Sequence, residues 1–285
     1  MRTRAPLLSL FALAACLLPA AALAGAWLPA RGEYYSELAA SRSFADTYYD
    51  ALGARYSLPL SERLEGRRLD FYSELGWKKR ASFQLGIPLV SETFSAPDFG
   101  YSATETGFGN LQLGFRFKLH DGPTALALQT DYIAPMGYQT RTFPTLGGGV
   151  AVARQQLLYG TGIKRWSTIV EAGLGYNSYF QGLRSQISAT ATVSQWFGSS
   201  LLVSGHFFGL QTLAATKDTP EDFRFNEVGP EVRYRVDDRL DVFAGSNHLA
   251  SGRNFTHPDQ YYVGMSFRQS KRNRLQGLLG TKTRP

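Results

Sequence analysis

The chain has little of what stabilises most exported or membrane proteins. Its 285 residues include a single cysteine, Cys16, so the sequence excludes a scaffold held by disulfides. Beyond the N-terminus there is no apolar run near twenty residues, which excludes a helical membrane protein, and no helical periodicity over a helix-length window. Hydrophobic residues nevertheless make up 44% of the chain, too many for a disordered protein. One large domain made of strands remains.

Acidic residues are absent from both ends of the chain, and this explains its basic character. The formal charge of the whole chain is +7. Residues 1–24 contribute two arginines and residues 268–285 contribute six basic residues, so residues 25–267 carry a formal charge of −1. The body of the protein therefore offers no electrostatic surface for a polyanion, and no nucleic-acid partner is expected.

The first 24 residues have the pattern of a secretory signal peptide. Arg2 and Arg4 precede an apolar stretch from Ala5 to Leu23, and Ala22-Leu23-Ala24 is the small-x-small pattern that signal peptidase cleaves. We expect cleavage after Ala24. A competing interpretation is a lipoprotein signal, because the segment ending at Cys16 resembles a lipobox and Cys16 would then be acylated.

From residue 32 onward, apolar and polar residues alternate with period 2, the pattern of strands with two different faces. For example, Leu69, Phe71 and Leu75 share one face while Asp70 and Glu74 share the other. The alternating segments are close to the length that a tilted strand needs to cross a bilayer. They predict an all-β fold, a transmembrane antiparallel up-and-down β-barrel of about 12 strands over residues 25–268, followed by a basic tail at 269–285. The strands are expected near residues 33–43, 68–75, 81–89, 110–118, 126–134, 157–164, 168–176, 187–197, 201–210, 228–236, 240–246 and 261–267.

The connections between these segments alternate in length, as periplasmic turns and extracellular loops do in outer-membrane barrels. An even number of strands then brings both termini to the periplasmic side. Pro88 and Pro230 interrupt this pattern, because each lacks an N–H for the ladder, and a bulge or strand end is expected at each. A further strand at residues 48–60 would make the number odd. Short turns are expected near residues 78–79, 120–123, 165–166, 198–199 and 237–239, and longer loops near residues 44–66, 90–106, 135–154, 211–222 and 249–259.

Aromatic residues gather beside the predicted short turns. Trp77, Trp166, Trp196 and Tyr234 lie there, and amphipathic rings of this kind prefer the headgroup level of a membrane. We interpret them as the periplasmic aromatic girdle. The alternative is a soluble sandwich with aromatic strand ends, which gives no reason for turns to alternate so regularly in length.

The segment from Gly107 to Gly114 resembles the outer-membrane family named for the meta-pathway of phenol degradation. Members of that family carry a Gly-x-Gly-Asp/Asn segment that runs into an amphipathic strand. Similar motifs in the same order cover most of residues 65–268, among them Pro135-Met136-Gly137 and Ser251-Gly252-Arg253-Asn254. The resemblance implies an outer-membrane barrel that passes small hydrophobic or aromatic compounds, and it brings no catalytic residues. The basic tail after Phe267 departs from the usual ending of such barrels.

Because hydrocarbon offers no partner for polar groups, the polar face of each strand should line the lumen. Both signs of charge are present there in similar numbers. The charges either pair and hold a partly blocked barrel together, or line a narrow polar path as a charged constriction. The residues expected to line the path are Asp70, Arg116, Asp131, Glu171, Arg233 and Arg235.

The sequence offers weak support for catalysis or metal binding. A barrel lipase needs a serine and a histidine close together on one face, and the nearest approach is His248 with Ser251. His248, His257 and Asp259 fall in one predicted loop, but their spacing is better explained by chance than by a metal site. We therefore expect neither an enzyme nor a cofactor.

The sequence thus predicts a passive channel in the outer membrane of a Gram-negative bacterium. Its expected partners are outer-membrane lipid, the barrel-assembly machinery and a small hydrophobic or aromatic solute. Two alternatives from other classes are a structural or adhesive barrel that binds a partner through its loops, and a lipid-modifying barrel enzyme.

Overall fold

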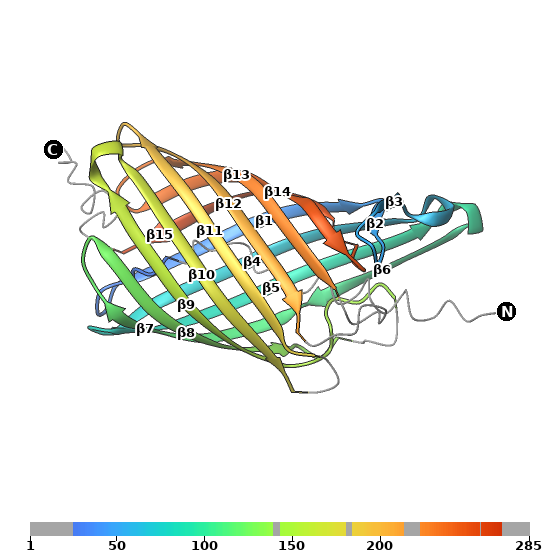
Figure 1. Ribbon diagram of the computed structural model, residues 1–285, viewed down its shortest axis with the longest axis horizontal. Coiled ribbons are helices and arrows are strands. Elements are labelled where there is room, and N and C mark those ends of the chain that lie inside the picture. The colour runs from blue at the N-terminus through green and yellow to red at the C-terminus, as the bar shows by residue number, and fades with distance from the viewer. Residues whose placement is uncertain (1–24, 139–142, 181–183, 214–222, 257, 270–285) are drawn as a thin grey trace.

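In the computed structural model, one antiparallel sheet closes into a barrel (Figure 1). The structure describes residues 25–138, 143–180, 184–213, 223–256 and 258–269, so the predicted signal peptide with Cys16 and nearly all of the basic tail lie outside the described residues. The ring closes because β4 pairs with both β1 and β5. The wall strands are β1 (Tyr34–Ala45), β4 (Arg63–Lys78), β5 (Ala81–Ala96), β6 (Tyr101–Phe108), β7 (Asn110–His120), β8 (Thr124–Pro135), β9 (Val152–Ile163), β10 (Thr168–Tyr179), β11 (Gln186–Phe197), β12 (Leu201–Thr212), β13 (Arg224–Arg235), β14 (Leu240–Arg253) and β15 (Asp259–Arg268).

These elements make a barrel of 12 strands, which confirms the predicted fold class. β6 and β7 follow one another along the same side of β5 and together form one wall strand. Residues 48–60, which could have added a strand, contribute instead to a separate hairpin of β2 (Thr47–Tyr49) and β3 (Arg55–Ser57). The number of wall strands therefore stays even.

The two faces of the wall follow the period-2 pattern of the sequence. In β4, Leu69, Phe71 and Leu75 are exposed on the outside, whereas Glu74 is buried inside. The same division runs around the ring. The outer surface is a continuous apolar belt, which is the face a bilayer requires, and the polar side chains are enclosed.

The short turns at residues 79–80, 121–123, 164–167, 198–200 and 236–239 lie at one end of the barrel, and the longer connections lie at the other (Figure 1). The first and last wall strands also meet at the short-turn end, where the Gln269 N–H donates to the Tyr34 carbonyl at 2.9 Å. One expectation was wrong: residues 90–106 are not a loop. β5 continues to Ala96 and pairs with β6, so a long hairpin projects at the long-loop end.

The two interior prolines are accommodated differently. Between the pairs Leu89↔Phe108 and Gly86↔Gln112, two residues of β5 face three residues of the neighbouring strand, so a bulge lies opposite Pro88 as predicted. β13, in contrast, runs through Pro230 without ending. Its pairing with β14 shifts register between Asn226 and Glu227 instead of at the proline.

Asp237 organises the short turn between β13 and β14. Its Oδ1 accepts hydrogen bonds from the N–H groups of Arg239 at 2.6 Å and Leu240 at 2.8 Å. These bonds favour the ionised carboxylate and hold the pKa of Asp237 below its ordinary value of 3.8.

The lowered pKa of Asp237 predicts how the stability of this turn depends on pH. The stabilisation by the ionised carboxylate should be complete above pH 3.8, the unfolded value, and should be lost as the pH falls through the lower pKa of the folded state. We expect the Asp237 carboxyl carbon, followed by NMR in detergent micelles, to titrate with a midpoint below 3.8 in the folded protein. The urea-unfolded chain is the control. Equal midpoints in the two states would contradict this account of the turn.

Candidate functional site: the interior of the barrel

A segment that belongs to no strand runs inside the barrel at its short-turn end. Ala26 and Leu28 are 0% and 1% exposed and pack against Ala125, Ala127 and Leu158 of the wall. We call residues 25–30 the inner segment. It was not predicted from the sequence, since the residues before the first strand carry no alternation.

Two wall glycines make room for the inner segment. A side chain at Gly76 would lie 1.9 Å from the carbonyl oxygen of Ala30, and one at Gly160 would lie 2.6 Å from the ring of Trp27. Both distances are shorter than any van der Waals contact. The wall is therefore shaped to hold this segment closely.

The Arg116 guanidinium joins the inner segment to the wall. It donates to the Gly25 carbonyl at 2.9 Å, to Glu74 Oε2 at 3.2 Å and to Gln129 Oε1 at 2.8 Å. Nearby, the fully buried Asp131 pairs with Arg154 at 2.9 Å. These charged groups are paired, as enclosed charges must be to avoid a large desolvation cost.

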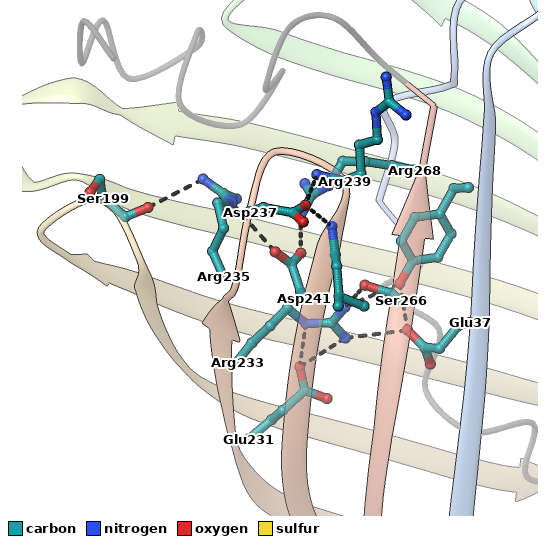
Figure 2. Close-up of polar contacts among 12 residues, drawn as sticks. Glu37, Ser199, Glu231, Arg233, Arg235, Asp237, Arg239, Asp241, Ser266 and Arg268 are labelled. Carbon is teal, nitrogen blue, oxygen red and sulfur yellow. Dashed lines mark hydrogen bonds and ion pairs between the residues drawn. The ribbon is translucent and has the colours of Figure 1, made fainter. Parts of the chain in front are cut away.

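A second cluster surrounds Arg233 (Figure 2). Its guanidinium lies 3.1 Å from Glu231 Oε1 and 3.3 Å from Glu37 Oε2, and it donates to Ser266 Oγ at 3.0 Å. Arg233 is 4% exposed. One cation thus bridges carboxylates from β1 and β13.

A third group lies at the ends of β13, β14 and β15. Asp241 pairs with Arg235 at 3.4 Å and also with Arg268, and Arg235 donates to the Ser199 carbonyl at 3.3 Å (Figure 2). The guanidinium carbon of Arg235 also lies 4.4 Å from the ring centroid of Trp196, a cation–π contact. Two arginines therefore share one carboxylate here.

Between the inner segment and these clusters lies a cavity of about 170 Å³. Its apolar part is formed by the tryptophans Trp27 and Trp196 with Ile169 and Leu202. A second cavity, next to Asp70, has about 10 Å³, room for one water molecule. Among the described residues, the interior thus contains at least one space large enough for a small solute.

The structure places all six predicted lining side chains inside the barrel, but not in one constriction. Four of them border the larger cavity: Arg116, Glu171, Arg233 and Arg235. Asp70 borders the small cavity and pairs with Arg68 at 2.8 Å. Asp131 lines neither of these two cavities.

Three of the four predicted girdle residues occupy the expected positions. Trp77, Trp166 and Tyr234 are each more than half exposed and lie beside short turns; their depth in a membrane stays a prediction. Trp196 corrects the prediction. It is 6% exposed and faces the interior, because it shares its strand face with the buried Ser194. Nearness to a turn suggested the girdle, whereas the alternation of β11 already assigned Trp196 to the inner face.

At the long-loop end, a cluster of buried phenylalanines lies on the inner side of the wall. Phe225 stacks on Phe255 with ring centroids 4.2 Å apart, and Phe223 and Leu210 complete the cluster. Because these residues come from β12, β13 and adjoining connections, they gather only in the folded barrel. The lumen therefore has apolar groups at both ends of a charged middle.

One polar group lies on the outer face, near the long-loop end of β14. His248 Nε2 lies 3.0 Å from Ser246 Oγ, and His248 Nδ1 lies 3.6 Å from Asp259 Oδ1. Ser251, the serine that the sequence suggested, accepts a hydrogen bond from Asn226 instead. Among the described residues, which omit His257, no group of three metal-ligating side chains is found.

The fold and its interior define a transmembrane β-barrel of the up-and-down class. No protein-family model matches the sequence, and a search of curated proteins finds no match, so the resemblance to the phenol-degradation family stays a prediction. Among solved structures, an outer membrane channel from Pseudomonas putida F1 is similar with a TM-score of 0.69 at 13% identity, over 85% of this chain and 97% of that chain. The translocator domain of the autotransporter NalP from Neisseria meningitidis is similar with a TM-score of 0.51 at 11% identity, over 85% of this chain and 90% of that one. At such low identity, these likenesses show a shared barrel fold.

Proposed function

We propose that the protein is a passive channel of the Gram-negative outer membrane for small apolar or aromatic solutes, closed here by the inner segment. The observation that carries the proposal is the pair of apolar clusters inside the lumen, one around Phe225 and Phe255 and the other around Trp27 and Trp196. A water-filled general pore would not need apolar groups at both ends of its path. The outer-membrane location is supported by the predicted signal peptide together with the apolar outer belt.

Two partners follow from this proposal without being part of the transport path. The apolar belt would be covered by outer-membrane lipid, and the barrel-assembly machinery would insert the chain into the membrane. A structural or adhesive barrel remains the alternative in which the interior only holds the wall together.

Current through planar bilayers tests the channel. We expect rare, small steps from the mature protein and larger, more frequent steps from a variant that lacks residues 25–30, because that segment fills the short-turn end of the lumen. Benzyl alcohol should reduce the current, whereas glycerol at the same concentration should not. Folding of both proteins is checked by the shift in gel mobility on heating. If neither folded protein carries current, the channel proposal fails and the structural alternative is favoured.

Hydrolysis of lipid esters is a second candidate, favoured by the Ser246–His248–Asp259 contacts on the outer face. In that reaction Ser246 Oγ would attack the acyl carbon while His248 takes its proton and passes it to the departing alcohol; water would then release the acyl group. Labelling by a fluorophosphonate that is lost in Ser246→Ala, but kept in Ser251→Ala, would support it. An unlabelled folded protein would exclude it.

A further inference from the structure

The larger cavity has an aromatic side of the right size for one ring. Trp27 and Trp196 border it together with Ile169 and Leu202. Its volume of about 170 Å³ is close to that of an apolar cavity known to bind benzene, about 150 Å³. This side would accept the body of an aromatic molecule.

The cavity is also bordered by side chains with unused hydrogen-bond donors. Among the described residues, Trp27 Nε1, Trp196 Nε1 and Arg268 Nε are buried and have no hydrogen-bond partner. All three residues line the cavity. Buried donors without an acceptor destabilise a protein, so a ligand that brings acceptor oxygens would be stabilised here.

On this wall of the cavity two arginines share one buried carboxylate. Arg235 and Arg268 both pair with Asp241 (Figure 2). The acidic residues of the adjoining turn, Asp237 and Asp238, are exposed and do not line the cavity, although the charge of Asp238 attracts both guanidinium groups from outside it. A guanidinium pair that shares one carboxylate favours a second anion.

Besides Asp241, three carboxylates line the cavity: Glu33, Glu74, which pairs with Arg116 at 3.2 Å, and Glu171. Glu171, in β10, is three strands along the wall from β13. A side chain at Gly25 would come within 2.6 Å of its carboxylate. The predicted cleavage after Ala24 would therefore place the new α-ammonium group beside Glu171 and neutralise it.

We propose that this cavity binds an aromatic carboxylate, with the carboxylate between Arg235 and Arg268 and the ring against Trp196 and Trp27. As a statement about the solute, the proposal rests on the channel function, but the binding itself can be measured without transport. Neutral aromatic hydrocarbons and alcohols should bind more weakly because they have no carboxylate to pair with the arginines. Short aliphatic acids should bind more weakly because they have no ring to contact the tryptophans.

Calorimetry on the folded, signal-cleaved protein in detergent micelles tests this proposal with benzoate, benzyl alcohol and acetate. Benzoate should bind at least about tenfold more tightly than either of the others, since a charge-assisted hydrogen bond contributes about that factor. Arg268→Gln should weaken benzoate binding about 10- to 100-fold. Arg268→Lys should keep part of the affinity because the charge is retained. Trp196→Leu should weaken it about 2- to 10-fold through loss of the ring contact.

Trp166→Leu, a change at an exposed tryptophan outside the cavity, is the matched control and should bind benzoate as the unaltered protein does. Equal affinity for benzoate and benzyl alcohol would overturn the proposal, as would benzoate binding that neither Arg268→Gln nor Trp196→Leu weakens. A protein that binds benzoate but carries no current would refute the channel and keep this site. A protein that carries current but does not bind benzoate would refute this binding site and keep the channel.

Discussion

Replacing Arg233 with leucine is expected to lower the free energy of unfolding by about 3–5 kcal/mol. The guanidinium is 4% exposed and lies within 3.3 Å of carboxylates from both Glu37 and Glu231. Its removal leaves two enclosed carboxylates without their shared cation, and the desolvation of an unpaired charge is the dominant cost. Because Glu37 belongs to β1 and Glu231 to β13, the loss should weaken the closure of the ring on both sides of β14 and β15.

Urea-induced unfolding of the protein in phospholipid vesicles measures this change. Arg42→Leu is the matched control: the Arg42–Glu65 pair spans 3.3 Å, as in the interior, but its side chains are 54% and 36% exposed. An exposed ion pair contributes at most about 1 kcal/mol, so this variant should unfold almost as the unaltered protein does.

A compensated variant separates charge from packing. Arg233→Leu combined with Glu37→Gln and Glu231→Gln removes the unpaired charges, and should recover a large part of the lost stability. If Arg233→Leu and Arg42→Leu were equally stable, the enclosed charges would have to be solvated well enough to need no partner, and the ion pairs around Arg233 would not stabilise the barrel.

The class of fold was predictable because a period of 2 is a local property. Each apolar residue of β4 that the sequence assigned to the outer face, such as Leu69 or Phe71, is exposed there, and each charged residue assigned inward lies inside. A missing N–H is also a local property, and a bulge lies opposite Pro88 as predicted, but the same expectation was wrong for Pro230, where β13 continues and the register shifts between Asn226 and Glu227 instead. For Trp196 the prediction was wrong because nearness to a turn was used in place of the alternation.

The arrangement of the candidate site was not predictable in the same way. That Asp241 serves both Arg235 and Arg268 depends on the register between β13, β14 and β15, which a single sequence does not specify. The inner segment could not be predicted for a different reason. It fits against the wall because Gly76 and Gly160 have no side chains there, and a glycine in a strand does not show which distant residue approaches it.

Gly76→Val is expected to open the lumen by expelling the inner segment. Its new side chain would begin 1.9 Å from the Ala30 carbonyl oxygen, a backbone atom that cannot turn aside as a side chain would. Overpacking of this kind costs about 1–3 kcal/mol, and here the cost falls on the closed arrangement alone. A shift of that size changes the ratio of open to closed barrels about 5- to 150-fold, which should be seen as a rise in the open probability of single channels.

Gly205→Val tests whether the effect depends on that contact, because a side chain at Gly205 meets no atom within 4 Å and the residue lies in a wall strand as Gly76 does. Its current should match that of the unaltered protein. Gly160→Leu, in β9, tests the same opening independently, because a Cβ at this position would lie 2.6 Å from the Trp27 ring and would clash with it. If both inward variants fold, as judged by heat-dependent gel mobility, and neither raises the open probability, then the inner segment does not close the channel. The closure would then have to lie elsewhere, and the buried phenylalanine cluster of the long-loop end, Phe223, Phe225 and Phe255, would be the next candidate.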